Sequence, residues 1–367
     1  MKNNSELKKY LKEINIEFRK KLPIPNFTSF GQEIEFVNIN QIELFKMVEA
    51  INNTHKLSTI LYSGEQNIFS VDKFAPFEGL CEIQTPILIN DEDNFHLFAL
   101  ILDTLKKMGG EITSSCGSHI NINGLTFMQR EHLILLLKIF IIYEPILYKF
   151  GYGYADMPRK SLLRERQTRS MGPNIINVKI YNNIIEKLEK KLCEGEQKFD
   201  EYFNEIFVIK NIKANTTLEL NNLKHKINNY QLSDNHLTNN FINSRVEFRF
   251  FSGTLDKEIA QNNINLILNM VNKIINDELD LEEIEFLYRK VVNEGRFSYD
   301  NNEPSKKRQY DINLMTYTNI PTKDIAEFAD KFFCNEIDKY YFIKQGAKIF
   351  SEQELYNKVF NLSHLKM

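Results

Sequence analysis

The sequence predicts an α+β fold in which helices cover one face of an antiparallel sheet. Segments with strict polar–apolar alternation, the period of a strand, are separated by longer segments with the period of a helix. The strand-like segments lie far apart along the chain and are connected through these helical stretches. A sheet of this kind buries its apolar face beneath the helices.

The elements are expected in the following order. An amphipathic helix occupies residues 5–21 and ends before Pro23 and Pro25. Four strands are expected at 30–37, 79–85, 117–123 and 244–252, with further strand-like alternation over 215–223. Helices are expected at 41–53, 91–108, 128–150, 180–206, 256–277, 281–293, 323–334 and 351–362. Residues 151–177 are rich in Arg, Gly and Pro and predict a long loop, a feature that is often functional.

The composition excludes several classes of protein. The 367 residues carry 46 Lys and Arg against 49 Asp and Glu, which argues against a protein built to hold nucleic acid or an anionic membrane. Hydrophobic residues make up 43% of the chain, enough for a sizeable core and too many for a disordered protein. The most apolar run, Leu133–Phe150, contains Pro145 and charged residues, so we expect a buried helix there and no membrane span.

The cysteines and the N-terminus indicate the compartment. The four cysteines stand far apart and form no Cys-x-x-Cys pair, which argues against a zinc knuckle or a thioredoxin-type motif. They are Cys81, Cys116, Cys193 and Cys334. No apolar leader segment follows Met1, so we expect no signal peptide. Reduced thiols in a cytoplasmic protein are the expectation.

Acidic side chains share one face of each of the first two strands. Glu33 and Glu35 are two residues apart and therefore point the same way, while apolar residues take the other face. Glu82 and Gln84 alternate in the same manner in the second strand. Carboxylates at this spacing of roughly 6.5–7 Å repel unless a cation lies beside them. A pair of glutamates by itself is more typical of a solvent-exposed sheet face than of a metal site.

The third and fourth strands carry other polar groups. His119 and Asn121 share a face that is backed by two isoleucines. In the fourth strand Arg245, Glu247 and Arg249 share a face, and the opposite face is Val and Phe. A surface ladder of ion pairs would stabilise the protein little, and the aromatic backing indicates a central strand instead.

If the four strands belong to one sheet, their polar faces combine into one surface. Carboxylates with one neutral imidazole suit Mg²⁺ or Mn²⁺ better than structural zinc. Two arginines beside such a metal suit a polyphosphate, whose oxygens bridge metal and guanidinium. The residues alone therefore predict a divalent-metal nucleotide site and no particular reaction. The groups concerned are Glu33, Glu35, Glu82, Glu247, His119, Arg245 and Arg249.

Four motifs in this order resemble those of the putative amidoligases, carboxylate–amine ligases of the glutamine synthetase and glutamate–cysteine ligase superfamily. They are Gly31-Gln32-Glu33-Ile34-Glu35, Glu82-Ile83-Gln84-Thr85-Pro86, Cys116-Gly117-Ser118-His119 and the segment 245–255. The resemblance spans roughly residues 28–275 and implies a glutamine synthetase-like curved antiparallel sheet with helices on its convex face. We accordingly expect an N-terminal helical extension at 1–27, a catalytic domain at 28–277 and a mainly helical extension at 278–367 packed on it.

The resemblance implies an ATP-dependent ligase that forms an amide or isopeptide bond through an acyl phosphate, with ATP and Mg²⁺ on the concave sheet face. By this resemblance Glu33, Glu35, Glu82 and Glu247 would be metal ligands, and His119 would bind a metal or a nucleotide phosphate. Arg249 and Arg245 would hold the transferred phosphoryl group. The substrates would be small molecules, amino acids or peptides that offer a carboxylate and an amine. The sequence leaves the oligomeric state open.

Two further features qualify this picture. The family commonly has His-x-His in its third motif, whereas this chain has Asn121 at the second position. Asn121 can still donate a hydrogen bond to a phosphate or substrate, but it cannot titrate. In the loop at 151–177, Arg166 and Arg169 are expected either to close over a phosphate or carboxylate or to be solvated.

Two other functions fit the same pattern. One is a phosphotransferase to a nitrogen nucleophile on the same fold, and the other is a protein that binds a nucleotide or peptide without turnover. The full set of carboxylates, histidine and arginines counts against a protein that only binds. The chain has no Gly-x-Ser-x-Gly, His-Glu-x-x-His or P-loop motif, so we expect catalysis by positioning and electrostatics.

Overall fold

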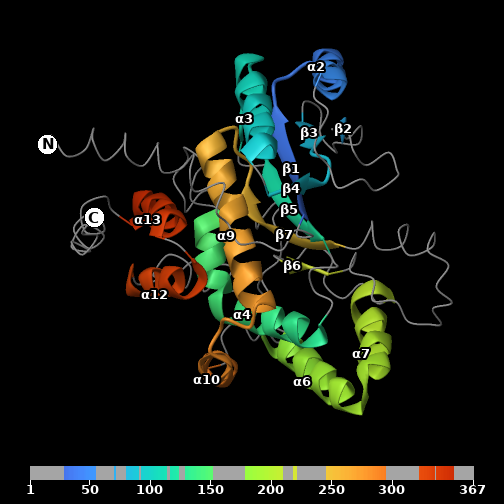
Figure 1. The fold of residues 1–367 in the computed structure, drawn as a ribbon, viewed down its shortest axis with the longest axis vertical. Helices are drawn as coiled ribbons and strands as arrows, with labels where there is room; N and C mark the ends of the chain where they lie inside the picture. Colours follow the sequence, from blue (N-terminus) through green and yellow to red (C-terminus); the bar gives the residue numbers. More distant parts are fainter. Residues whose placement is uncertain are drawn as a thin grey trace, which may run out of the picture. The chain divides into compact units, whose positions relative to one another are not determined.

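The computed structural model describes residues 29–54, 70–71, 80–90, 92–113, 116–123, 129–151, 178–209, 218–220, 245–294, 322–334 and 336–350. They form a mixed α+β protein with antiparallel strands, as the sequence predicts (Figure 1). The chain divides into two compact units, each assembled from segments that are distant in the sequence. The first unit draws on Met1–Ile112, Gly253–Lys273 and Pro321–Met367, and the second on Thr113–Ser252 and Ile274–Ile320.

The first unit contains a four-stranded antiparallel sheet. β1 (Ser29–Val37) pairs with β3 (Leu80–Gln84) and, near its start, with β4 (Leu88–Ile89). β2 (Ser70–Val71) pairs with the other side of β3. Alternate residues of β1 are fully buried, because the period of two sends every second side chain into the core.

Two helices accompany this sheet. They are α2 (Gln41–Thr54) and α3 (Glu92–Lys107), and Figure 1 shows α3 running alongside β1. The aromatic rings of Phe30 on β1 and Phe95 on α3 lie 5.6 Å apart between centroids, so this helix packs on the apolar face. One face of the sheet therefore packs on this helix, and the other face carries Glu33, Glu35, Glu82 and Gln84.

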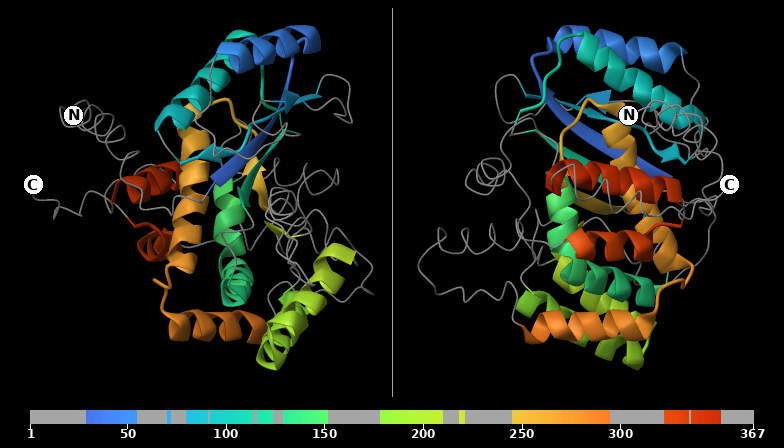
Figure 2. Two further views of the ribbon diagram at one scale, coloured as in Figure 1. Left: turned by 45° about the vertical axis from the view of Figure 1, so that its right-hand side comes forward. Right: turned by 90° about the vertical axis from the view of Figure 1, so that its left-hand side faces the viewer.

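A seam of buried amides joins α9 (Lys257–Ile275) to α13 (Glu336–Phe350). The Nδ2 groups of Asn265 and Asn269 donate to the buried carboxylate of Asp338 over 3.0 and 2.7 Å. Buried polar groups are retained where hydrogen bonds replace their lost water, and here the amides supply those bonds. Phenylalanine rings add apolar contact between α13 and α12 (Thr322–Phe332), and Figure 2 shows both helices beside α9.

The second unit contains three antiparallel strands in the order β5 (Gly117–Asn123), β7 (Arg245–Ser252) and β6 (Leu218–Glu219). The long apolar helix α4 (Arg130–Gly151) packs against β7. The rings of Phe140, Phe248 and Phe250 form the contact, with centroid separations of 5.6 and 6.0 Å from Phe140.

The end of α4 approaches β7 so closely that only glycine fits. A Cβ atom at Gly151 would overlap the backbone carbonyl of Phe250. Gly151 is thus a packing requirement, because any side chain would push α4 away from β7.

Charged side chains hold the remaining helices of this unit to α4. The Nζ of Lys138, a largely buried group, lies 2.5 Å from Glu189 on α6 (Val178–Glu194) and 2.6 Å from Glu285 on α10 (Leu281–Asn293). Burial alone would raise the pKa of the Glu285 carboxyl, but hydrogen bonds from Lys138 and Arg289 hold this pKa below its ordinary value. One lysine therefore connects three helices.

The structure corrects three expectations about helices. The single helix expected at 180–206 is wrong, because Gly195 adopts a φ of 124° and separates α6 from α7 (Glu196–Phe203), which continues as a π-helix, η3 (Asn204–Ile209). The helix expected at 323–334 ends at Phe332. Within the extension expected to be mainly helical, no helix was assigned to Glu336–Phe350, where the structure has α13.

Other expectations fall outside the described residues. They are the helices at 5–21 and 351–362 and nearly all of the loop at 151–177. The division at residues 27 and 277 and the likeness to glutamine synthetase stay predictions. All four cysteines are free thiols. Among the helices of the described residues, none combines the length and the apolar character that crossing a bilayer requires.

Phe248→Ala should destabilise the protein by about 3–5 kcal/mol, the usual cost of removing a buried phenylalanine. Phe248 is fully buried and its ring contacts Phe140, so the deletion leaves a cavity between β7 and α4. Chemical denaturation followed by circular dichroism measures the effect. Phe286→Ala is the matched control, because Phe286 is 68% exposed on α10. Equal effects of the two substitutions would contradict the assignment of Phe248 to the core.

Candidate functional site

In the first unit, three carboxylates share the polar face of β1 and β3. Glu33, Glu35 and Glu82 are half-buried, and the residues between them on each strand are buried. The register places Glu35 directly opposite Glu82, and Glu33 directly opposite Gln84. Residues directly opposite each other in an antiparallel pair lie on the same face. The structure thus brings together the carboxylates of the first two motifs.

The juxtaposition of Glu35 and Glu82 has an electrostatic consequence. Like charges directly opposite each other destabilise a sheet, and a nearby cation reverses the sign of that effect. The amide of Gln84 donates to Glu82 over 2.9 Å, which orients this carboxylate on the polar face. Oxygen ligands arranged in this way are the kind that Mg²⁺ and Mn²⁺ prefer.

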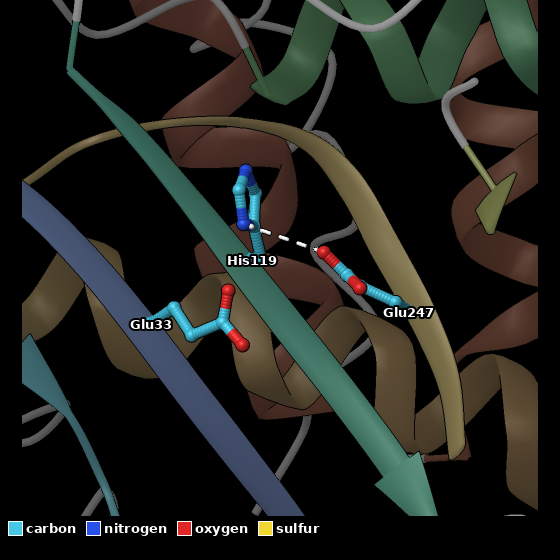
Figure 3. A group of neighbouring side chains, drawn as sticks. All are labelled: Glu33, His119 and Glu247. Carbon is cyan, nitrogen blue, oxygen red and sulfur yellow. Dashed lines mark ion pairs between the residues drawn. The ribbon is translucent and has the colours of Figure 1, made fainter. Parts of the chain in front are cut away.

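In the second unit, the polar faces of β5 and β7 meet around Glu247. The Nδ1 atom of His119 lies 3.4 Å from an Oε atom of Glu247, and Figure 3 shows the imidazole and the carboxylate facing each other across the two strands. Asn121 stands directly opposite Glu247 in the register. The histidine of the third motif and the glutamate of the fourth are therefore neighbours.

Glu247 is an acidic side chain that is only 2% exposed. Its carboxylate pairs with the guanidinium of Arg249 on the same strand, and Arg245 lies farther away, at 3.9 Å. A buried carboxylate needs such partners because it has lost its water. Arg249 is largely covered and Arg245 is 46% exposed, so the two arginines of this strand differ in burial.

A β-bulge changes the alternation of β7 beside His119. Ser118 pairs with Phe251 and Ile120 pairs with Phe248, so β7 contains one more residue than β5 over this interval. The consecutive residues Phe250 and Phe251 are both buried, and their ring centroids lie 4.2 Å apart. Because of the bulge, Ser252 stands opposite Gly117, on the same face of the strand as Arg249.

The last part of the fourth motif forms the turn into α9. The side-chain oxygen of Thr254 accepts a hydrogen bond from the backbone N–H of Asp256 over 3.1 Å. Asp256 in turn accepts from the N–H groups of Glu258 and Ile259 in the first turn of α9, which is the bonding of a helix cap. Thr254 and Asp256 thus support the helix that follows β7.

The register also reveals a residue that the sequence analysis missed. Glu219 on β6 is directly opposite Glu247 on β7. The strand-like alternation over 215–223 was the available signal, but the pairing partner of so short a strand cannot be read from local sequence. Arg166 and Arg169 lie outside the described residues.

Comparison with protein families identifies the class of the chain. The family model described as "putative amidoligase enzyme" matches residues 27–271, about two thirds of the 367 residues. The chain belongs to this family, as its four motifs indicate, and the family name supports a ligase. A search of curated proteins finds no match. The helices α12 and α13 lie beyond the matched region.

Glu35→Gln should stabilise the ligand-free protein, by about 0.5 kcal/mol, because it removes one of two like charges that face each other. Thermal or chemical unfolding without added metal measures this gain. Glu33→Gln is the matched control, since Glu33 faces the neutral Gln84 and should show no such gain. A loss of stability in Glu35→Gln would contradict the assigned repulsion.

Proposed function

We propose that this protein is an ATP-dependent carboxylate–amine ligase that forms an amide or isopeptide bond through an acyl phosphate. The observation that carries the proposal is the surrounding of Glu247, a nearly buried carboxylate that contacts both an imidazole and a guanidinium group on one polar sheet face. A metal ligand, a phosphate ligand and a cationic side chain are the parts that phosphoryl transfer requires. The membership in the amidoligase family supports the choice of ligase over kinase.

The donor set fits a divalent cation. In the second unit, His119 and Glu247 offer an imidazole nitrogen and a carboxylate oxygen that lie 3.4 Å apart (Figure 3). Such a mixture suits Mg²⁺ or Mn²⁺, which take mainly oxygen ligands. We propose that His119 and Glu247 hold metal in the active enzyme, and that Glu33, Glu35 and Glu82 supply ligands of a further ion. The register supports this role, because it places Glu35 directly opposite Glu82 on the polar face.

In the proposed reaction, a bound Mg²⁺ would neutralise charge on the phosphates of ATP. The chain's own residues would do the rest. Arg249 would bind the transferred phosphoryl group through its planar fork, and Asn121 would donate to a phosphate or substrate oxygen. Glu247 would orient both Arg249 and His119, because it contacts each of them. Arg245 is the more exposed arginine and would act at the edge of the site.

The substrate carboxylate would attack the γ-phosphorus, which gives an acyl phosphate and ADP. An amine would then attack the acyl carbon, and phosphate would leave with the amide formed. No side chain of the protein becomes covalently attached in this scheme. The protein supplies position and charge, which agrees with a site built from carboxylates, amides and arginines rather than from a nucleophile.

The test measures nucleotide turnover. Purified protein with Mg-ATP and a pool of amino acids and peptides should release ADP and free phosphate only when both a carboxylate and an amine are present. Glu247→Gln should lower this rate by at least about 100-fold, because the neutral amide cannot replace the carboxylate beside the metal and Arg249. Circular dichroism should show the variant folded. A phosphorylated acceptor in place of free phosphate would instead indicate a kinase.

Arg249→Lys should lose nearly as much activity as Arg249→Ala, since lysine keeps the charge but lacks the two parallel N–H donors. The expected loss is about 100-fold or more in kcat. Arg245→Lys is the matched control on the same strand, and it should retain most activity because Arg245 is half-exposed and farther from Glu247. Near-normal activity of Arg249→Lys would exclude the bidentate role.

A further inference from the structure

Ser252, the last residue of β7, is a buried polar residue that the proposed mechanism does not use. The residue is 5% exposed, and its hydroxyl has no hydrogen-bond partner among the described residues. Buried hydroxyls are normally satisfied, because an unmade hydrogen bond costs free energy. Among the described residues this hydroxyl therefore lacks a partner, and the location of Ser252 indicates which kind of ligand would supply one.

The register places Ser252 on the same face as His119. Ser252 stands directly opposite Gly117, and Gly117 precedes His119 by two residues on β5, so the two positions point the same way. The bulge is responsible for this arrangement. Without the extra residue in β7, Phe251 would stand opposite Gly117, and an aromatic ring would occupy the polar face.

The neighbours of Ser252 favour an anionic oxygen as the missing partner. Gly117 has no side chain to contact the hydroxyl from the opposite strand, and Arg249 supplies a guanidinium group on the same polar face. A hydroxyl and a guanidinium together bind phosphate oxygens, which accept several short hydrogen bonds. The hydroxyl is closed to solvent, so side chains must adjust when a ligand reaches it, as they commonly do on binding.

We propose that the Ser252 hydroxyl donates a hydrogen bond to a phosphoryl oxygen of the bound nucleotide. This inference rests on the proposed function and adds a ligand-binding residue to it. Ser252 would extend the phosphate site along β7 beyond Arg249, on the side away from Arg245. The bulge would then place the Ser252 hydroxyl, instead of the Phe251 ring, opposite Gly117 on the polar face.

The experiment compares three proteins by calorimetric titration with Mg-AMP-PNP and, separately, with Mg-ADP. Ser252→Ala should bind Mg-AMP-PNP about tenfold more weakly than the wild type, the usual effect of losing a hydrogen bond to a charged group. Ser118→Ala is the matched control, because Ser118 is also buried on β5 but stands opposite Phe251, on the other face. It should bind both nucleotides as the wild type does.

A second readout separates binding from folding. The melting temperature of ligand-free Ser252→Ala should equal or exceed that of the wild type, because the hydroxyl makes no hydrogen bond within the described residues. A clear loss of stability would assign Ser252 a structural role and overturn the inference. If the wild type binds both nucleotides and Ser252→Ala binds them with unchanged affinity, the inference about Ser252 is overturned while the proposed function stands. A wild type that binds neither nucleotide would overturn the proposed function as well.

Discussion

The second unit depends on how a single strand, β7, accommodates a buried carboxylate. Its apolar face carries the phenylalanines that pack on α4, so the strand is held firmly in place. Its other face must then keep Glu247 charged with little access to water. Arg249 and His119 meet this requirement, because a buried charge persists only beside partners that replace its hydration. One face of β7 thus contributes to the packing of the core, and its other face sets the geometry of the site.

The local arrangements that oppose stability gather on the polar strand faces. Glu35 faces Glu82, Glu247 is nearly excluded from water, and the hydroxyl of Ser252 has no partner among the described residues. On the opposite faces, the same strands bury apolar residues in regular alternation apart from the bulge. In most of a protein, the side chains favour the same fold through local propensity, packing and hydrogen bonding. Functional sites are the usual exceptions. The polar faces are therefore better explained by a ligand than by the needs of folding.

Much of this arrangement could be predicted from the sequence, because strand alternation is a local property. It predicted β1, β3, β5 and β7 to within a residue at each end, together with the shared faces of Glu33 and Glu35 on β1 and of Glu82 and Gln84 on β3. The register could not be predicted, since it depends on pairing between segments far apart in the chain. The Glu35–Glu82 pair, the Glu219–Glu247 pair and the bulge all follow from the register. Convergence of the carboxylates of the first unit with those of the second stays a prediction.

The C-terminal helices α12 and α13, which lie beyond the family match, have a structural role. β7 ends at Ser252, and the turn of Thr254 and Asp256 starts α9 directly after it. The position of α9 is in turn maintained by Asn265 and Asn269, whose amides donate to the buried Asp338 of α13. A hydrogen-bonded buried carboxylate specifies one docking geometry more sharply than apolar contact does, because a shifted helix would leave it unsatisfied. The C-terminal helices therefore fix the helix that continues the strand on which Glu247 and Arg249 lie.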